Sequence, residues 1–202
     1  MNKHLNPEEM IALARLYRKA GFRVHGMFIF GYPARPGQPF AMPIQERVRR
    51  FRRFIRRSRL DTVQVLLPVP LPGTDMTARL GEQGRIYPTD CIGWEYYDGN
   101  FPLFEPDPPM TAEDMQAASQ EIMGRFYRAD RLFAVGLDIL SFPALAFQLH
   151  RLGTAWGRWR QRWWRNVYRA GGWLMRRRWV SLFRKGTFPE KLAAAKMHKQ
   201  AH

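Results

Sequence analysis

The segment Met27–Phe30 places four apolar residues in a row, immediately before Gly31. A strand with one face in water alternates apolar and polar residues, whereas an unbroken apolar run is typical of a parallel strand that is covered on both faces. A second run, Thr62–Leu67, is rich in β-branched and apolar residues and ends at Pro68. The pattern therefore predicts two parallel strands, one beginning at His25 and one beginning with the second run.

Each predicted strand follows a predicted helix. The first helix is expected over about Pro7–Ala20. Asn6 suits its N-cap, and Gly21 suits the left-handed position that follows its last turn. The second helix is expected over Ile44–Leu60, where one face is apolar and arginines occupy the rest. The apolar face consists of Ile44, Val48, Phe51 and Ile55.

The alternation of helix and strand indicates an α/β fold with a parallel sheet and right-handed crossovers. Two parallel strands by themselves would expose both sheet edges, and they could not bury faces as apolar as those of the HGMFIF segment. We therefore expect the chain to be the end of a larger barrel, whose earlier strands would lie upstream.

The sequence divides into three regions. Residues 1–75 contain the predicted helix–strand–helix–strand unit, and residues 76–130 combine a mostly irregular stretch with a capping helix. That helix is predicted to begin after Thr111, which can form a capping box with Asp114, and to run to about Ala129. Residues 131–202 form a basic extension that is expected to be helical.

The composition is that of a folded and strongly basic protein. Its 202 residues are 46% hydrophobic and carry a formal net charge of +16, which predicts an anionic partner: nucleic acid, an acidic membrane surface or an acidic protein. Cys91 is the one cysteine, so this chain alone cannot form a disulfide framework or a cysteine-ligated metal site. The histidines do not fall at ligand spacing, and no metal site is predicted.

Five motifs follow one another along Met1–Arg131: MNKHLN, GFRVHGMFIFGYP, DTVQVLLPVPLPGTDM, GWEYYDGNFPLFEPDPPMTAEDM and FYRADR. In this order they resemble the second half of a radical SAM enzyme of the cobalamin-binding class. The resemblance implies the C-terminal part of a partial (β/α)6 TIM-like barrel, with the two predicted strands as its fifth and sixth. It also implies S-adenosylmethionine and a [4Fe–4S] cluster as cofactors, with cobalamin as a further cofactor of the class.

The resemblance further implies that the ends of the two strands bind the adenine ring of S-adenosylmethionine. By this resemblance, Ile29 and Gly31 correspond to the I-x-G motif of the family's fifth strand, which contacts adenine. In that motif an apolar side chain stacks on the base, and a glycine permits close approach of the backbone. The resemblance carries Leu67 and Pro68 onto the end of the sixth strand, whose backbone groups reach the same base. This sequence departs from the family at Ala34, where a polar residue is common, and in the RPGQPFAMP loop, which replaces the usual Asp-Thr.

The family holds its cluster on a CxxxCxxC loop, which supplies three thiolates, whereas this chain has a single cysteine. We therefore expect that the chain alone does not cleave S-adenosylmethionine, and we interpret it as a truncated, split or frameshifted member. An N-terminal half with the cluster and the cobalamin domain is the partner that this interpretation implies. The alternative is a non-enzymatic basic module that binds an anionic membrane or nucleic acid through residues 155–185.

The basic tail supports three interpretations. Apolar residues recur near helical spacing with arginines between them: Trp156, Trp159, Trp163, Val167 and Leu174. Such a helix can dock its tryptophans on the rest of the protein, lie on an anionic membrane, or stack on nucleic-acid bases. The arginine-rich helix over Ile44–Leu60 leaves a similar choice between a solvated face and contact with RNA or lipid.

The expected location is the cytoplasm, with attachment to a membrane surface as a variant. Met1–Asn6 leads directly into a helix start and lacks the apolar region of a signal peptide. Leu132–Leu149 is apolar but is interrupted by Gly136, Asp138 and Pro143. We therefore expect it to form a buried or surface-lying helix pair instead of a membrane span.

Overall fold

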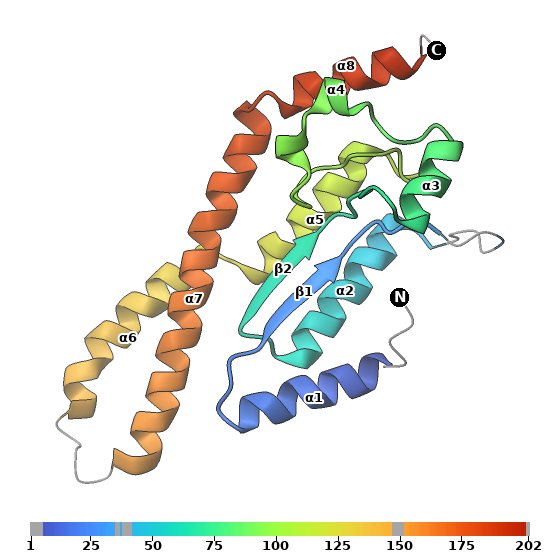
Figure 1. Ribbon diagram of the computed structural model, residues 1–202. Helices are drawn as coiled ribbons and strands as arrows, with labels where there is room; N and C mark the ends of the chain where they lie inside the picture. The colour runs from blue at the N-terminus through green and yellow to red at the C-terminus, as the bar shows by residue number, and fades with distance from the viewer. Residues whose placement is uncertain (1–5, 35–36, 38–41, 147–151, 201–202) are drawn as a thin grey trace.

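The computed structural model describes residues 6–34, 37, 42–146 and 152–200. The structure is 64% helical, and two strands lie side by side near its centre (Figure 1). In chain order the elements are α1 (Pro7–Lys19), β1 (His25–Ile29), α2 (Ile44–Ser58), β2 (Thr62–Leu66), α3 (Asp75–Glu82), α4 (Thr89–Ile92), the 3-10 turn η1 (Trp94–Tyr96), α5 (Ala112–Phe126), α6 (Asp130–Ala146), α7 (Leu152–Lys185) and α8 (Phe188–Gln200).

The helices predicted after Asn6 and Thr111 are confirmed, and a capping box begins each of them. The Asn6 side chain accepts a hydrogen bond from the Glu9 N–H at 2.8 Å, and the Glu9 carboxylate accepts one from the Asn6 N–H at 3.2 Å. Thr111 and Asp114 exchange the same pair of bonds at the start of α5. Local side-chain chemistry therefore sets where both helices begin.

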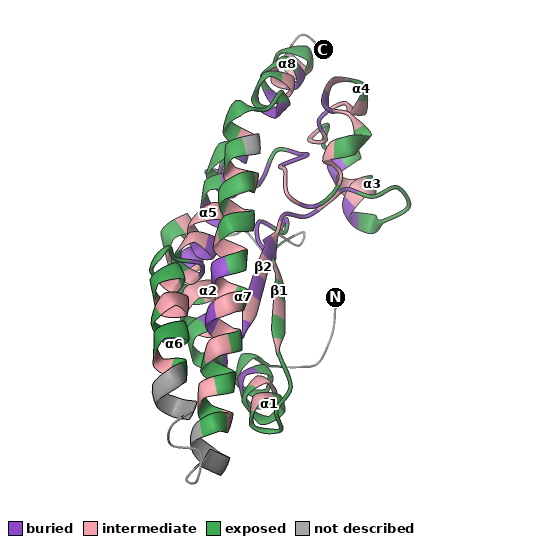
Figure 2. Cartoon of the chain, turned by 90° about the vertical axis from the view of Figure 1, so that its left-hand side faces the viewer, coloured by how far each residue is buried: buried purple, intermediate pink, exposed green. Residues whose placement is uncertain are grey.

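The prediction of a partial (β/α)6 barrel was wrong. The described residues contain two parallel strands in a small open sheet, with His25 opposite Thr62 and Ile29 opposite Leu66. On the face that α2 and α5 cover, Val63 and Val65 are buried. On the other face, Met27 and Ile29 are 63% and 47% exposed. Exposed and half-buried residues alternate along β1 (Figure 2). The apolar run of β1 therefore does not mean that this chain covers both of its faces.

The two edges of the sheet differ. The Tyr127 hydroxyl accepts a hydrogen bond from the Val63 N–H and donates one to the Val63 carbonyl, both at 2.8 Å. The Ser119 hydroxyl donates to the Val65 carbonyl at 3.0 Å. Side chains from α5 and its C-terminal end thus occupy the backbone groups that a further strand beside β2 would use. On the outer side of β1, no strand of the described residues is paired.

The main core lies between the sheet and the helices α2 and α5. Phe30, Val48 and Met115 are completely buried there. The helix α7 packs across Tyr127, and a Cβ atom at Gly172 would lie 2.2 Å from the tyrosine ring. Gly172 therefore permits the close approach that holds the Tyr127 hydroxyl at the edge of β2.

Most of the stretch from Gly73 to Pro109 is irregular, as predicted, and it also contains the short helices α3 and α4 and the turn η1. A second apolar cluster joins this stretch to α8, with Tyr87, Ile92 and Phe188 at most 1% exposed. The helices α3 and α4 have eight and four residues, which is too short for a helical repeat to stand out in the sequence. Tertiary packing stabilises both helices: α4 packs against α8, and Met76 and Leu80 of α3 belong to the main core.

The helices α6 and α7 pair with each other at the side of the molecule (Figure 1). Asp138 on α6 is 4% exposed, and its carboxylate accepts hydrogen bonds from Arg162 and Asn166 of α7, both at 2.7 Å. Phe133 and Leu140 on α6 are more than 70% exposed. Among the described residues, no helix combines the length and the apolar character that crossing a bilayer requires.

Candidate binding sites

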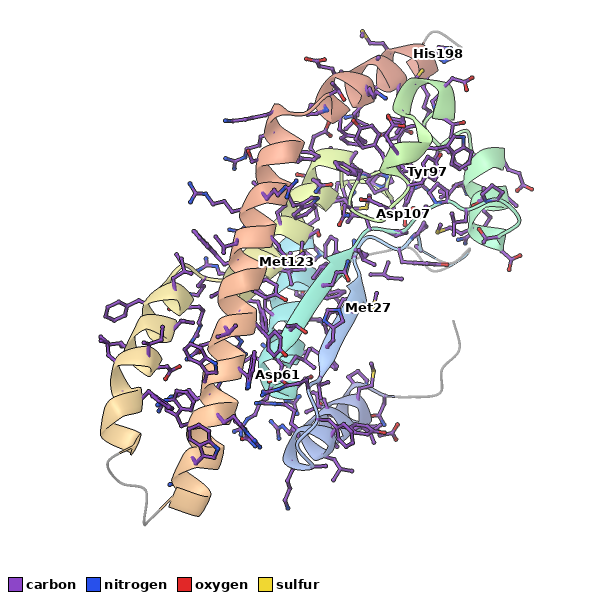
Figure 3. The ribbon with its side chains drawn as sticks, turned by 60° about the vertical axis from the view of Figure 1, so that its left-hand side comes forward. Met27, Asp61, Tyr97, Asp107, Met123 and His198 are labelled. Carbon is purple, nitrogen blue, oxygen red and sulfur yellow. The ribbon has the colours of Figure 1, made fainter. Side chains whose placement is uncertain are left out.

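A hollow of about 510 Å³, here called the strand-end hollow, lies at the carboxyl ends of β1 and β2. Figure 3 shows Tyr97 above the ends of the strands. The lining residues are Ile29, Tyr32, Leu66, Leu67, Pro68, Val69, Leu71, Thr74, Asp75, Met76, Tyr97, Asp98 and Gly99. Ligands of open α/β sheets bind in this position, outside the carboxyl ends of parallel strands.

The far wall of the strand-end hollow is a tight turn. The Leu67 N–H donates to the Gly99 carbonyl at 2.7 Å, which joins this turn to the end of β2. The exposed Asp98 carboxylate accepts hydrogen bonds from the Asn100 N–H and side-chain amide at 2.8 and 2.6 Å. Burial raises the pKa of Tyr97, whose hydroxyl therefore stays protonated at neutral pH. The wall presents one carboxylate and one phenol beside an apolar floor.

Three of the four predicted adenine contacts, Ile29, Leu67 and Pro68, lie together in the strand-end hollow. Ile29 is partly exposed, whereas the Leu67 side chain is 2% exposed and its N–H is already bonded. Gly31 does not line the hollow. Its φ is +86°, and an added Cβ atom would lie 2.2 Å from the sulfur of Met115, so this glycine serves the packing of β1 on α5.

The residues of this chain do not fit an iron–sulfur cluster. Cys91 is a free and half-buried cysteine at the end of α4. No group of three or more His, Cys, Asp or Glu side chains in the described part of the chain is placed to hold a metal ion. A [4Fe–4S] cluster needs several thiolates, and the sequence contains one.

A second and larger hollow, of about 890 Å³, is lined by residues of α1, α2, α5, α6 and α7 and is here called the arginine cleft. Eleven of its fourteen lining residues are arginines. The lining consists of Arg18, Arg49, Arg52, Arg53, Ile55, Arg56, Arg59, Ile122, Arg125, Phe126, Arg128, Arg131, Arg165 and Arg169. Arginines 49, 53 and 56 line the cleft together because residues at this spacing fall on one face of α2.

Backbone carbonyls hold two of these arginines in place. Arg18 of α1 donates to the Arg59 carbonyl at the end of α2, and Arg169 of α7 donates to the Leu60 carbonyl at 3.1 Å. The C-terminal end of a helix carries partial negative charge and attracts cations. A carbonyl does not neutralise a guanidinium. Arg169, which has no ion pair with a described residue, therefore keeps its full charge in the arginine cleft, whereas Arg18 also lies 3.4 Å from the Asp61 carboxylate.

The tryptophans of the tail pack within the helix pair α6 and α7. Trp159 stacks between Trp156 and Trp163, with ring centroids 5.3 and 5.7 Å apart, and it also contacts Phe142 of α6. The Trp159 indole N–H donates to the Asp138 carbonyl at 3.3 Å. These rings therefore help to hold α7 against α6.

No family model, no curated protein and no solved structure matches this chain.

Proposed function

We propose that the strand-end hollow binds the adenine ring of S-adenosylmethionine and that the chain is part of a radical SAM protein. The observation that carries this proposal is the meeting of Ile29 with Leu67 and Pro68 in one hollow. These residues come from different strands, and the resemblance to the cobalamin-binding class marks them as adenine contacts. The carboxyl ends of parallel strands are also where α/β sheets take nucleotides.

The chemistry of the strand-end hollow suits an adenine ring. Ile29 is 47% exposed and offers an apolar surface on which a base can stack, with Leu66 and Met76 nearby in the lining. The adenine amino group is a hydrogen-bond donor, and the Asp98 carboxylate retains acceptor capacity beyond its two bonds from Asn100. The role of this chain in the proposal is to bind and orient the base.

Other residues would have to hold the cluster. In the family, the cluster cleaves S-adenosylmethionine to a 5′-deoxyadenosyl radical, but one cysteine does not ligate it. We assign no reaction step and no cobalamin contact to this chain. The partner would be the half that carries the cluster, and it would add a strand beside β1, whose outer edge is unpaired among the described residues.

Isothermal titration of the purified chain with S-adenosylmethionine and S-adenosylhomocysteine tests the proposal without a cluster. We expect saturable one-to-one binding. Ile29→Asn should weaken it by about fivefold or more, because a polar amide replaces the stacking surface. Met27→Asn is the matched control, since Met27 is exposed on the same face of β1 but outside the hollow. Absence of binding, or equal losses in both variants, would contradict the proposal.

The second candidate function is attachment to an anionic membrane through the pair α6 and α7. The observation that favours it is the exposure of Phe133 (71%) and Leu140 (75%) on α6, next to the arginine-rich helix α7. Exposed apolar side chains beside cationic ones are typical of helices that lie in the membrane interface. Nucleic acid is less well supported, because Trp156, Trp159 and Trp163 stack on one another.

Sedimentation with vesicles of phosphatidylcholine and phosphatidylglycerol tests this candidate. We expect the double variant Phe133→Asp and Leu140→Asp to remain in the supernatant. The control double variant, Leu13→Asp and Leu16→Asp, removes two exposed apolar residues of α1 and should still sediment with the vesicles. Retention of binding in the α6 variant would exclude the helix pair as the attachment site.

A further inference from the structure

The arginine cleft holds far more positive than negative charge. Carboxylates reach four of its arginines: Asp61 lies 3.4 Å from Arg18, Glu121 lies 3.5 Å from Arg52, and Asp130 contacts Arg128 and Arg131. The other seven have no ion pair with any described residue: Arg49, Arg53, Arg56, Arg59, Arg125, Arg165 and Arg169. The cleft therefore lacks several negative charges that would balance it.

The excess positive charge affects the more buried arginines of the arginine cleft, Arg165 and Arg169. Burial, and then repulsion from Arg131 and Arg165, lowers the pKa of Arg169 to about 10. Burial, and then repulsion from Arg18 and Arg131, also lowers the pKa of Arg165. The Nε atoms of Arg131 and Arg169 are buried without a hydrogen-bond acceptor. A buried donor without an acceptor is unfavourable, and a bound anion would supply one.

We propose that the arginine cleft binds a compact anion that carries several phosphate groups. Guanidinium groups form paired, charge-assisted hydrogen bonds with phosphate oxygens, and arginines reach this cleft from all of its walls. A volume of about 890 Å³ is within the range of small-molecule sites. The site is separate from the strand-end hollow, and no residue lines both.

The lining does not favour a ligand that must stack its bases. The apolar lining consists of Ile55, Ile122 and Phe126. The Phe126 ring is already covered, because the Arg169 guanidinium lies 4.5 Å from its centroid and Tyr127 packs on it edge to face. Single-stranded nucleic acids are held mainly by free aromatic surfaces together with basic groups. The cleft provides the basic groups without such a surface, which favours a polyphosphate.

The test uses tripolyphosphate as the probe and isothermal titration of the full chain at constant ionic strength. The cleft variant combines Arg49→Gln, Arg56→Gln and Arg125→Gln, which are exposed side chains without an ion pair among the described residues. The control variant combines Arg158→Gln, Arg160→Gln and Arg178→Gln, which are exposed and lie outside the cleft. Both variants lose the same net charge.

We expect the wild type to bind tripolyphosphate in a saturable manner, the cleft variant to bind about tenfold more weakly or worse, and the control variant to bind within about threefold of the wild type. Absence of saturable binding by the wild type would overturn the proposal. So would equal losses in the two variants, because binding would then follow net charge and not the cleft.

The phosphate groups can belong to a soluble anion or to a lipid head group. The same three proteins are therefore sedimented with phosphatidylcholine vesicles, with and without phosphatidylinositol 4,5-bisphosphate. Loss of lipid-dependent sedimentation in the cleft variant alone, together with its weaker binding of tripolyphosphate, identifies a head group as a ligand. If the cleft variant loses only tripolyphosphate binding, the ligand is a soluble polyphosphate. Both results support a phosphate site in the cleft.

Discussion

The two faces of the sheet, and its two edges, differ in how far the rest of this chain covers them. On one face, the strands pack against the buried side chains of α2 and α5. At the edge of β2, the hydroxyls of Tyr127 and Ser119 form hydrogen bonds with backbone groups of Val63 and Val65. On the other face Met27 and Ile29 are exposed, and the outer edge of β1 has no strand partner among the described residues. The covered side stabilises the fold, and the open side offers surface for binding.

Gly31→Ala should produce the largest loss of stability, because it disturbs the covered side in two ways. Alanine is strained at a φ of +86°, and its Cβ atom would lie 2.2 Å from the sulfur of the fully buried Met115. We expect the free energy of unfolding to fall by about 3 to 5 kcal/mol, as measured by urea denaturation. A loss below about 1 kcal/mol would show that α5 does not pack on this turn as described.

Tyr127→Phe should have the next largest effect. The change removes one hydroxyl that serves both the N–H and the carbonyl of Val63, and it leaves two buried backbone groups without a partner. The expected loss is about 2 kcal/mol, and hydrogen exchange at the Val63 amide should accelerate. Ser119→Ala, which removes a single bond to the Val65 carbonyl, serves as the milder comparison at about 1 kcal/mol. An unchanged exchange rate at Val63 would contradict the proposed capping of this edge.

Arg165→Gln should stabilise the protein slightly at pH 7 in buffer without polyvalent anions. Folding lowers the pKa of Arg169 to about 10. Above that pH the unfolded chain binds more protons than the folded chain, so stability rises with pH. Below it, Arg169 is charged in both states, and its unfavourable charge in the cleft lowers the free energy of unfolding. Removing the neighbouring charge should raise the free energy of unfolding by about 0.5 kcal/mol. In the presence of tripolyphosphate, the wild type should have the higher free energy of unfolding, because it binds the anion more tightly than Arg165→Gln does. A destabilised variant in anion-free buffer would contradict repulsion within the arginine cleft.

Met27→Thr should have the smallest effect. Met27 projects from β1 on the side away from the covering helices (Figure 3), and threonine suits a strand. We expect the midpoint of urea denaturation to change by an amount that corresponds to less than about 0.5 kcal/mol. A loss comparable to that of Tyr127→Phe would mean that the open side is covered in solution, for example by a second copy of the chain.

Sequence patterns predicted the local elements well because their signals are local. Asn6 and Thr111 begin helices through bonds to residues three positions away, and Pro68 ends β2 through its own covalent structure. The barrel was wrong because the apolar run of β1 indicates what the strand prefers to contact, not which residues provide the contact. The exposure of Met27 and Ile29 could be learned only from the structure.

The two hollows were predictable to different degrees. Ile29, Leu67 and Pro68 were predicted as adenine contacts from the family resemblance; all three line the strand-end hollow, and their contact with adenine stays a prediction. The resemblance also assigned Gly31 to the adenine site, but Gly31 does not line the strand-end hollow and packs against Met115, which is far along the chain. The arginine cleft was missed, because its walls come from α1, α2, α5, α6 and α7. The spacing of arginines 49, 53 and 56 was the one local signal, and it indicated a basic helix face without showing what faces it.

The separation of the two sites can be tested most directly by methyl NMR of the chain labelled at isoleucine. Ile29 lines the strand-end hollow, whereas Ile55 and Ile122 line the arginine cleft. We predict that S-adenosylmethionine shifts the methyl signal of Ile29 alone, and that tripolyphosphate shifts the signals of Ile55 and Ile122 and leaves Ile29 unchanged. Shifts of the same signals by both ligands, or an unchanged Ile29 signal with S-adenosylmethionine, would contradict the presence of two separate sites.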